Sequence, residues 1–258
     1  MSLIEDQLFQ TNRPQPLQFA PHGLSKTAPE GSLAAFQALS KEDWDGYVVH
    51  TYQIATGELV AFPEDSVDRL TNSDKGSIAQ LPWDEVQKLT LNKGDQSGSI
   101  PLLSQVLELL KGSLVHIHCE GGFYGESTAA SEIARLVTAN ELEESVFVTS
   151  PYLLCLRSYI LDNKDLPHGW RFDRHLFGGP VSLDEHPIHE ILESDIVVCL
   201  GADFLDAENV SALQERGLAV GTVRLHDEVD VKRACEAGVD WLVSEIRLSL
   251  EADDSSDA

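Results

Sequence analysis

The chain has 258 residues, of which 43 are acidic and 18 basic, so its formal net charge is -25. A field of that sign repels nucleic-acid backbones and anionic membranes, and no apolar run reaches the roughly 18 residues of a spanning helix. Four widely spaced cysteines, without a Cys-x-x-Cys pair or an N-terminal secretion signal, favour reduced thiols in a cytoplasmic protein.

Short apolar runs alternate with amphipathic segments along the chain. The runs predict strands at Leu17–Ala20, Gly46–Tyr52, Leu114–Cys119, Ser145–Thr149, Gly169–Phe172, Ile196–Leu200, Ala219–Leu225 and Trp241–Ser244. Helices are expected at Ser32–Leu39, Leu102–Leu110, Ala207–Arg216 and Val229–Ala237. Eight parallel βα units predict a (β/α)₈ TIM barrel, with a doubly wound open sheet as the alternative that the pattern leaves open.

Residues 1–250 are expected to form one TIM-barrel domain with a small insertion after the second strand. Glu58–Phe62 follows a glycine and is typical of the return arm of a hairpin. The segment 64–98 then exceeds an ordinary βα connection and carries a helical pattern at Pro82–Thr90. Long βα loops build the active face of a barrel, so we expect this insertion beside the site. The acidic run 251–258 is expected to be a disordered tail.

Several short segments follow the order and spacing of one family, and they lie between about Phe19 and Ser244. They include Ala20-Pro-His-Gly23, Ala28-Pro-Glu-Gly-Ser32, Val67-Asp-Arg-Leu-Thr71 and Ser99-Ile-Pro-Leu-Leu103. In these segments the chain resembles the glycerophosphodiester phosphodiesterases, which are phospholipase C-like barrels. The resemblance implies a TIM barrel and a phosphoric diester hydrolase of lipid metabolism. It also implies two acid–base histidines, a phosphate-binding arginine, and carboxylates that hold calcium or magnesium.

The family's acid–base positions are rewritten in this sequence. The resemblance maps the first histidine onto Pro21 and the second onto Pro63, which Glu64 follows. Proline has no proton to exchange, so neither residue can act as a general acid or base. The family's arginine position falls on His22. We therefore expect the parent reaction to be lost by the parent route.

The family's metal positions are rewritten as well. Its Glu-x-Asp pair falls on Val48 and His50, its third carboxylate on His118, and its lysine on Glu120. Calcium and magnesium prefer oxygen ligands, so the family's metal site is expected to be lost. Strand parity directs His118 and Glu120 into the barrel, beside His50 on the neighbouring strand.

Two kinds of site follow from these replacements, and a third reading needs neither. His22, His50, His118 and Glu120 together offer the ligands of a zinc-like transition metal at the barrel mouth. Alternatively, protonated His22 and the backbone amides near it hold a phosphate or another small anion. The simplest reading is that the imidazoles bond one another, backbone carbonyls or water.

Other polar residues complete the list of pocket candidates. Glu64 and Arg224 lie where strands end, and one of Trp170 and Arg171 is expected to face the pocket. Further candidates are Glu126, the segment Asp173–His175 and the glycine-rich loop Gly121–Gly125. His168, in contrast, is expected to be exposed.

Three functional hypotheses remain open on this sequence. The leading one is a phosphodiesterase-like barrel that has lost the parent activity and acts as a ligand-binding or regulatory protein. Its rival is an active metal-dependent phosphodiesterase with a rebuilt His/Glu site. The third is a scaffold that presents its acidic surface to a partner.

Overall fold

Eight parallel strands form a closed ring. The computed structural model describes residues 3–10, 13–24, 26–120, 128–162, 165–172 and 195–248. The ring strands are β1 (Leu17–Ala20), β2 (Gly46–Gln53), β6 (Leu114–Cys119), β7 (Val146–Ser150), β8 (His168–Phe172), β9 (Val197–Leu200), β10 (Ala219–Leu225) and β11 (Trp241–Ser244). Because β1 pairs with both β2 and β11, the sheet closes into a barrel and the open-sheet alternative is wrong.

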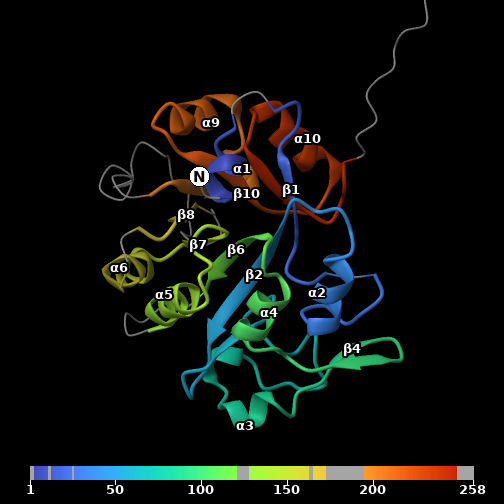
Figure 1. Cartoon of the computed structure of the whole chain (residues 1–258). Helices are drawn as coiled ribbons and strands as arrows, with labels where there is room; N and C mark the ends of the chain where they lie inside the picture. The colour runs from blue at the N-terminus through green and yellow to red at the C-terminus, as the bar shows by residue number, and fades with distance from the viewer. Residues whose placement is uncertain are drawn as a thin grey trace, which may run out of the picture.

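The helices surround the strands (Figure 1), with α9 and α10 at the top of the view and the insertion at the bottom. They are α1 (Leu3–Leu8), α2 (Leu33–Leu39), α4 (Leu103–Leu109), α5 (Ala129–Ala139), α6 (Leu153–Asp162), α9 (Ala207–Gln214) and α10 (Glu228–Ala237). The Ser32 hydroxyl accepts the Ala35 amide and begins α2, while Gly238 ends α10 at a φ of 79°. None of these described helices is long and apolar enough to cross a bilayer.

One end of the barrel is covered by α1. The amide of Ile4 donates to the Glu144 carbonyl at 3.0 Å, just before β7 begins. Ile4 and Leu8 pack with Phe19 of β1 in the core inside the ring. Since α1 covers the end where the strands start, the opposite end carries the mouth, as in other barrels of this type.

The insertion forms a small unit with its own core. Its elements are β3 (Leu59–Ala61), η1 (Ile78–Gln80), α3 (Trp83–Val86), β4 (Leu91–Lys93) and β5 (Gln96–Gly98). A second short 3-10 helix, η2 (Ala202–Phe204), is separate from the insertion and follows β9. The predicted hairpin is confirmed, because β3 pairs antiparallel with β2. The helix predicted at Pro82–Thr90 is too long, because α3 ends at Val86. Leu89 and Leu91, two residues apart, are both buried, and this spacing is typical of the extended chain that leads into β4.

Two glycines create room inside the barrel for a tryptophan and a close backbone approach. A Cβ on Gly221 would lie 1.9 Å from the Trp241 ring, and one on Gly169 would lie 1.6 Å from the Val197 carbonyl oxygen. Trp241 is fully buried there and packs against Phe147, with ring centroids 5.4 Å apart. This part of the interior is therefore a packed core.

His168 lies buried at the start of β8, so the expectation that it is exposed was wrong. The residue begins a strand of the closed ring, and its helical or loop pattern in the sequence was misleading. Its Nδ1 lies 2.6 Å from the Leu166 carbonyl oxygen, so Nδ1 carries the proton and Nε2 accepts. That Nε2 lies 3.3 Å from Asp195 Oδ1, and burial raises the pKa of Asp195 to about 7.

Asp195→Asn is expected to flatten the pH dependence of stability. The folded-state pKa of Asp195 exceeds its ordinary value of 3.8, so the folded chain holds more protons than the unfolded chain between these values. Unfolding free energy should therefore fall as pH rises from about 4 to about 7, and asparagine, which keeps a donor for His168, removes that fall. Urea unfolding across this range measures it, with Asp84→Asn on the surface as control. Equal slopes for wild type and Asp195→Asn would show that Asp195 titrates normally.

Candidate functional site

The register of β2 and β6 brings the predicted histidines together inside the barrel. His50 is paired with His118, and Val48 with His116, across the two parallel strands. All four side chains share the inward parity that the sequence predicted, because successive strand residues alternate between faces. The His50 and His118 ring centroids lie 4.5 Å apart. Two layers of imidazole thus line one wall of the barrel below its mouth.

Arg171, Glu120, His50 and His118 form a continuous hydrogen-bonded chain, which we call the mouth relay. The two terminal nitrogens of Arg171 donate to the Glu120 carboxylate, Nη1 to Oε1 and Nη2 to Oε2, the latter at 2.7 Å. Glu120 Oε1 accepts from His50 Nδ1 at 2.9 Å. His50 Nε2 then lies 3.1 Å from His118 Nδ1. When His50 is neutral and donates through Nδ1, its Nε2 accepts and His118 donates through Nδ1.

The charges of the mouth relay stabilise one another. Burial alone would raise the pKa of Glu120, but the Arg171 guanidinium and the His50 hydrogen bond outweigh it and hold that pKa well below its ordinary value. Burial lowers the pKa of His118, and the neighbouring His116 lowers it further. The relay therefore contains one carboxylate and one guanidinium, with a neutral His118 at its inner end.

A second group, which we call the arginine cluster, consists of His22, Glu30, Arg69 and Arg224. His22 Nε2 lies 2.7 Å from Arg224 Nη1 and 3.4 Å from Glu30 Oε1. Arg69 Nη1 lies 3.1 Å from Glu30 Oε2. Burial lowers the pKa of His22 to about 3, so its Nε2 accepts from the closer Arg224. The protonated His22 expected for anion binding is therefore disfavoured, and the positive charge is carried by the arginines.

The predicted zinc-like set is only partly brought together. His50, His118 and Glu120 have ligand atoms within 4.8 Å of one another. The Nε2 of His22 instead contacts Arg224 within the arginine cluster. Within the set, both nitrogens of His50 and both oxygens of Glu120 already have hydrogen-bond partners. The mouth relay is a closed hydrogen-bond network, and a metal would have to break it.

The calcium or magnesium that the resemblance implies does not fit the described mouth. The strand positions that would supply carboxylates hold Val48, His50 and His118, which are one apolar side chain and two imidazoles. Hard cations of this kind take oxygen ligands. Glu120 is an oxygen donor, but the Arg171 guanidinium occupies both of its oxygens.

The two prolines lie just beyond strand ends: Pro21 follows β1 directly, and Pro63 lies two residues after the last residue of β3. Pro21 and Pro63 are both buried, and the Pro63 ring packs against Gly31 in the loop that carries Glu30. Glu64 lies beside Pro63, where its carboxylate binds the Nε of Arg69 at 2.8 Å. Glu64 therefore belongs with the arginine cluster and does not reach the mouth relay in the contacts described.

Sequence reasoning missed several partners of these residues. Arg171, not Trp170, faces the barrel interior, because Trp170 packs outward with Phe172. Glu30 and Arg69 lie within the quoted family-like segments, but nothing in their spacing showed that they meet. Glu245, directly after β11, binds Arg224. The candidates Gly121–Gly125, Glu126, Asp173–His175 and the tail 251–258 lie outside the described residues.

The described chain is a closed (β/α)₈ TIM barrel with an antiparallel hairpin and an insertion after its second strand, and solved structures of phosphodiesterases have a similar fold. A glycerophosphodiester phosphodiesterase of Parabacteroides distasonis superposes with a TM-score of 0.74 at 16% identity, covering 90% of this chain and 94% of that one. An Oleispira antarctica phosphodiesterase in complex with sn-glycerol-3-phosphate gives 0.75 at 20% identity, covering 89% and 93%.

Sequence comparison agrees with the fold. A glycerophosphodiester phosphodiesterase of Caldanaerobacter subterraneus is 29% identical over 140 residues, 52% of this chain and 57% of that protein. One from Bacillus altitudinis is 25% identical over 162 residues, 58% of this chain and 62% of that protein. These alignments span less than two thirds of either relative, and no family model matches. In sequence and in fold, the chain is therefore similar to glycerophosphodiester phosphodiesterases.

Proposed function

We propose that this chain no longer cleaves glycerophosphodiesters by the family's route and instead binds a small phosphate-bearing ligand at the barrel mouth. The observation that carries the first half is that Pro21 and Pro63, onto which the resemblance maps the family's two acid–base histidines, are both buried prolines. A general acid or base must exchange a proton within hydrogen-bond reach of the substrate, and proline cannot. The poor fit of a hard cation removes the other half of the family's machinery.

Binding is supported by the arginine cluster. The side chains of Arg69 and Arg224 are 54% and 24% exposed, so both reach solvent although they are paired with glutamates. Their partners Glu64 and Glu245 are 32% and 37% exposed, and exposed ion pairs contribute only about 0–1 kcal/mol each, so a ligand displaces these two glutamates at small cost. Guanidinium groups bind phosphate through two parallel hydrogen bonds. The Oleispira phosphodiesterase bound to sn-glycerol-3-phosphate is a relative of the same fold, and it suggests glycerol phosphates as the ligand class.

Arg224→Met is expected to weaken sn-glycerol-3-phosphate binding by about 10–100-fold, because a charge-assisted hydrogen bond contributes about 1.5–3 kcal/mol. Isothermal titration calorimetry measures the affinity. Arg135→Met is the matched control, since Arg135 pairs with Glu132 on the exposed face of α5, away from the mouth. Equal affinity in wild type and Arg224→Met would refute the proposed binding mode. Absence of binding to the wild type would refute the ligand class.

An active enzyme with a rebuilt site is the second candidate, and the mouth relay favours it. His50 is 16% exposed at the mouth and its Nδ1 is held by the Glu120 carboxylate, as in a general base oriented by an acid. Its Nε2 already accepts from His118, so this base must give up a hydrogen bond to act. Turnover of glycerophosphocholine that disappears in His50→Gln would establish this candidate and overturn the proposal of lost activity.

A further inference from the structure

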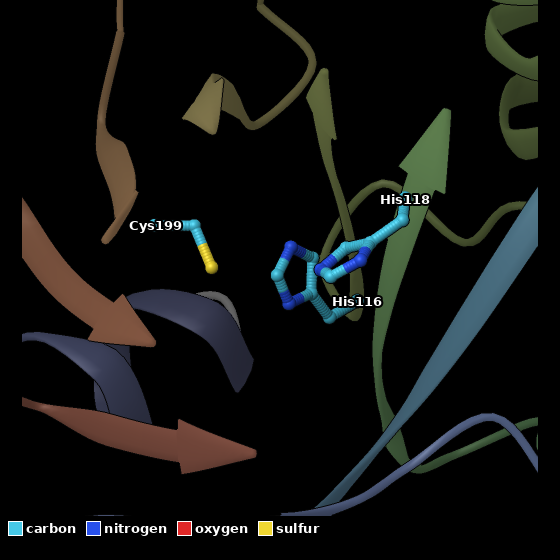
Figure 2. Close-up of side chains that lie close together, drawn as sticks. All are labelled: His116, His118 and Cys199. Atoms are coloured by element: carbon cyan, nitrogen blue, oxygen red, sulfur yellow. The ribbon is translucent and has the colours of Figure 1, made fainter. Parts of the chain in front are cut away.

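We propose that His116, His118 and Cys199 form a buried binding site for one thiophilic transition-metal ion, Cu⁺ or Zn²⁺, inside the barrel. The three ligand atoms of this interior triad lie within 4.8 Å of one another. The side chains approach from opposite walls, with His116 and His118 on β6 and Cys199 on β9 (Figure 2). The triad lies below the mouth relay and shares only His118 with it. The inference does not depend on the proposed ligand at the mouth.

Each imidazole of the triad has one nitrogen held and one nitrogen unpartnered. In the tautomer with a neutral His50, His118 Nδ1 donates to His50 Nε2 across 3.1 Å, and His118 Nε2 carries a bare lone pair. His116 Nε2 lies 2.8 Å from the Thr149 hydroxyl. His118 Nε2 and His116 Nδ1 have no hydrogen-bond partner among the described residues, and their side chains are 1% and 0% exposed. Buried nitrogens are usually satisfied, so this pair points to a ligand that the protein itself does not supply.

The hydrogen bonds on the held nitrogens of His116 and His118, the ones that would not bind the ion, match those of known metal sites. Ligating histidines commonly donate their second ring nitrogen to a carboxylate, a carbonyl or another polar group, which fixes the ring and its tautomer. The chain from Glu120 through His50 does this for His118, and the Thr149 hydroxyl does it for His116. Both rings are therefore oriented before an ion arrives.

Cys199 supplies the soft ligand that selects the ion. Its Sγ lies 2.9 Å from the Thr222 carbonyl oxygen and is fully buried. Metal binding replaces the thiol proton, which leaves to solvent, so the ion gains a thiolate and two neutral imidazoles. Thiolate and imidazole together select copper or zinc over calcium and magnesium. Bond lengths of about 2.0–2.3 Å require the three atoms to approach one another only slightly.

The surroundings of the triad are apolar and limit the charge that the site tolerates. Phe147 stacks on His116 with ring centroids 4.4 Å apart, and Trp241 meets the same ring edge-on at 5.9 Å. A complex of Cu⁺ with one thiolate and two imidazoles is neutral, whereas the Zn²⁺ complex carries one positive charge. Burying a net charge in such surroundings is costly, so Cu⁺ is the better match.

The experiment measures binding of Cu⁺ and of Zn²⁺ separately to the full chain under anaerobic, reducing conditions. Titration against a coloured chelator of each ion gives affinity and stoichiometry. We expect one ion per chain, and Co²⁺ substituted for Zn²⁺ should show thiolate-to-metal charge transfer. Cys199→Ser should abolish that band. It should also weaken binding by more than the roughly 10–100-fold that is lost when a residue hydrogen-bonded to a metal ligand is changed. Thr149→Val, which removes only the outer bond of His116, should cost about 10–100-fold.

A second thiol group in the core provides the control. Cys119 Sγ and Cys155 Sγ lie 3.1 Å apart, so this pair is the other thiol site for a soft ion in the described chain. Cys155→Ser should leave both affinity and charge transfer unchanged. Circular dichroism establishes that each variant is folded before titration. Failure of the wild type to bind either ion, or loss of binding in Cys155→Ser with retention in Cys199→Ser, would overturn the assignment.

Discussion

Arg171→Met is expected to lower the free energy of unfolding by about 3–5 kcal/mol, because it leaves a buried carboxylate without its cation. The Arg171 and Glu120 side chains are 8% and 12% exposed, and the pair is bidentate. The Arg171 guanidinium is also the principal group that holds the pKa of Glu120 down against the effect of burial. Without it, the His50 hydrogen bond is the remaining contact of the mouth relay to the Glu120 carboxylate.

The double variant Arg171→Met with Glu120→Gln separates a broken pair from a damaged core. Both charges are then absent, and much of the lost stability should return, since a buried ion pair is worth little against neutral residues of similar size. Urea unfolding at neutral pH measures all three proteins. Arg135→Met serves as reference, because its exposed pair with Glu132 should cost less than about 1 kcal/mol. If Arg171→Met alone were as stable as the wild type, the charges of Arg171 and Glu120 would not be in contact.

Gly221→Ala is the second change with a large expected effect. The added Cβ would lie 1.9 Å from the fully buried Trp241 ring, which cannot move without displacing Phe147. Overpacking of a core costs about 1–3 kcal/mol and sometimes more, and a contact this short at a rigid ring should reach at least the upper end. Chemical unfolding and the near-ultraviolet circular dichroism of Trp241 report the result.

Two further variants test whether the clash is the cause. Gly76→Ala introduces the same atom at a φ of 76° with nothing within 4 Å, so it should show backbone strain alone, about 1–2 kcal/mol. Combining Gly221→Ala with Trp241→Phe, which removes part of the clashing ring, should be less harmful than the sum of the two single changes. Simple additivity would mean that Gly221 and Trp241 do not touch.

The barrel was predictable from the sequence because its signal is local. Runs such as Leu114–Cys119 and Trp241–Ser244 are bounded by turn residues, and the eight predicted strands match those of the structure to within one residue at each end. The inward direction of His50 and His118 followed from strand parity, which needs only the strand assignment. The pairing of those two residues across β2 and β6 then followed from the barrel.

The partners of the site residues were not predictable in the same way. Arg224 meets His22 across 202 residues of sequence, and Arg171 meets Glu120 across 51. Such contacts depend on the rotamers of long side chains at a closed mouth, where several acids and bases compete for one another. Cys199 was noted only as a reduced thiol, since its approach to β6 depends on barrel closure rather than on neighbouring residues.

The central claim is that the residues at this barrel mouth do not perform the family's hydrolysis. A ³¹P NMR time course of glycerophosphocholine with the full chain, run in turn with calcium, magnesium, manganese and zinc, tests it most directly. We predict that the diester signal persists unchanged and that no glycerol phosphate signal develops with any of the ions. Growth of a monoester signal in proportion to the concentration of the chain, and its loss in His50→Gln, would contradict the account.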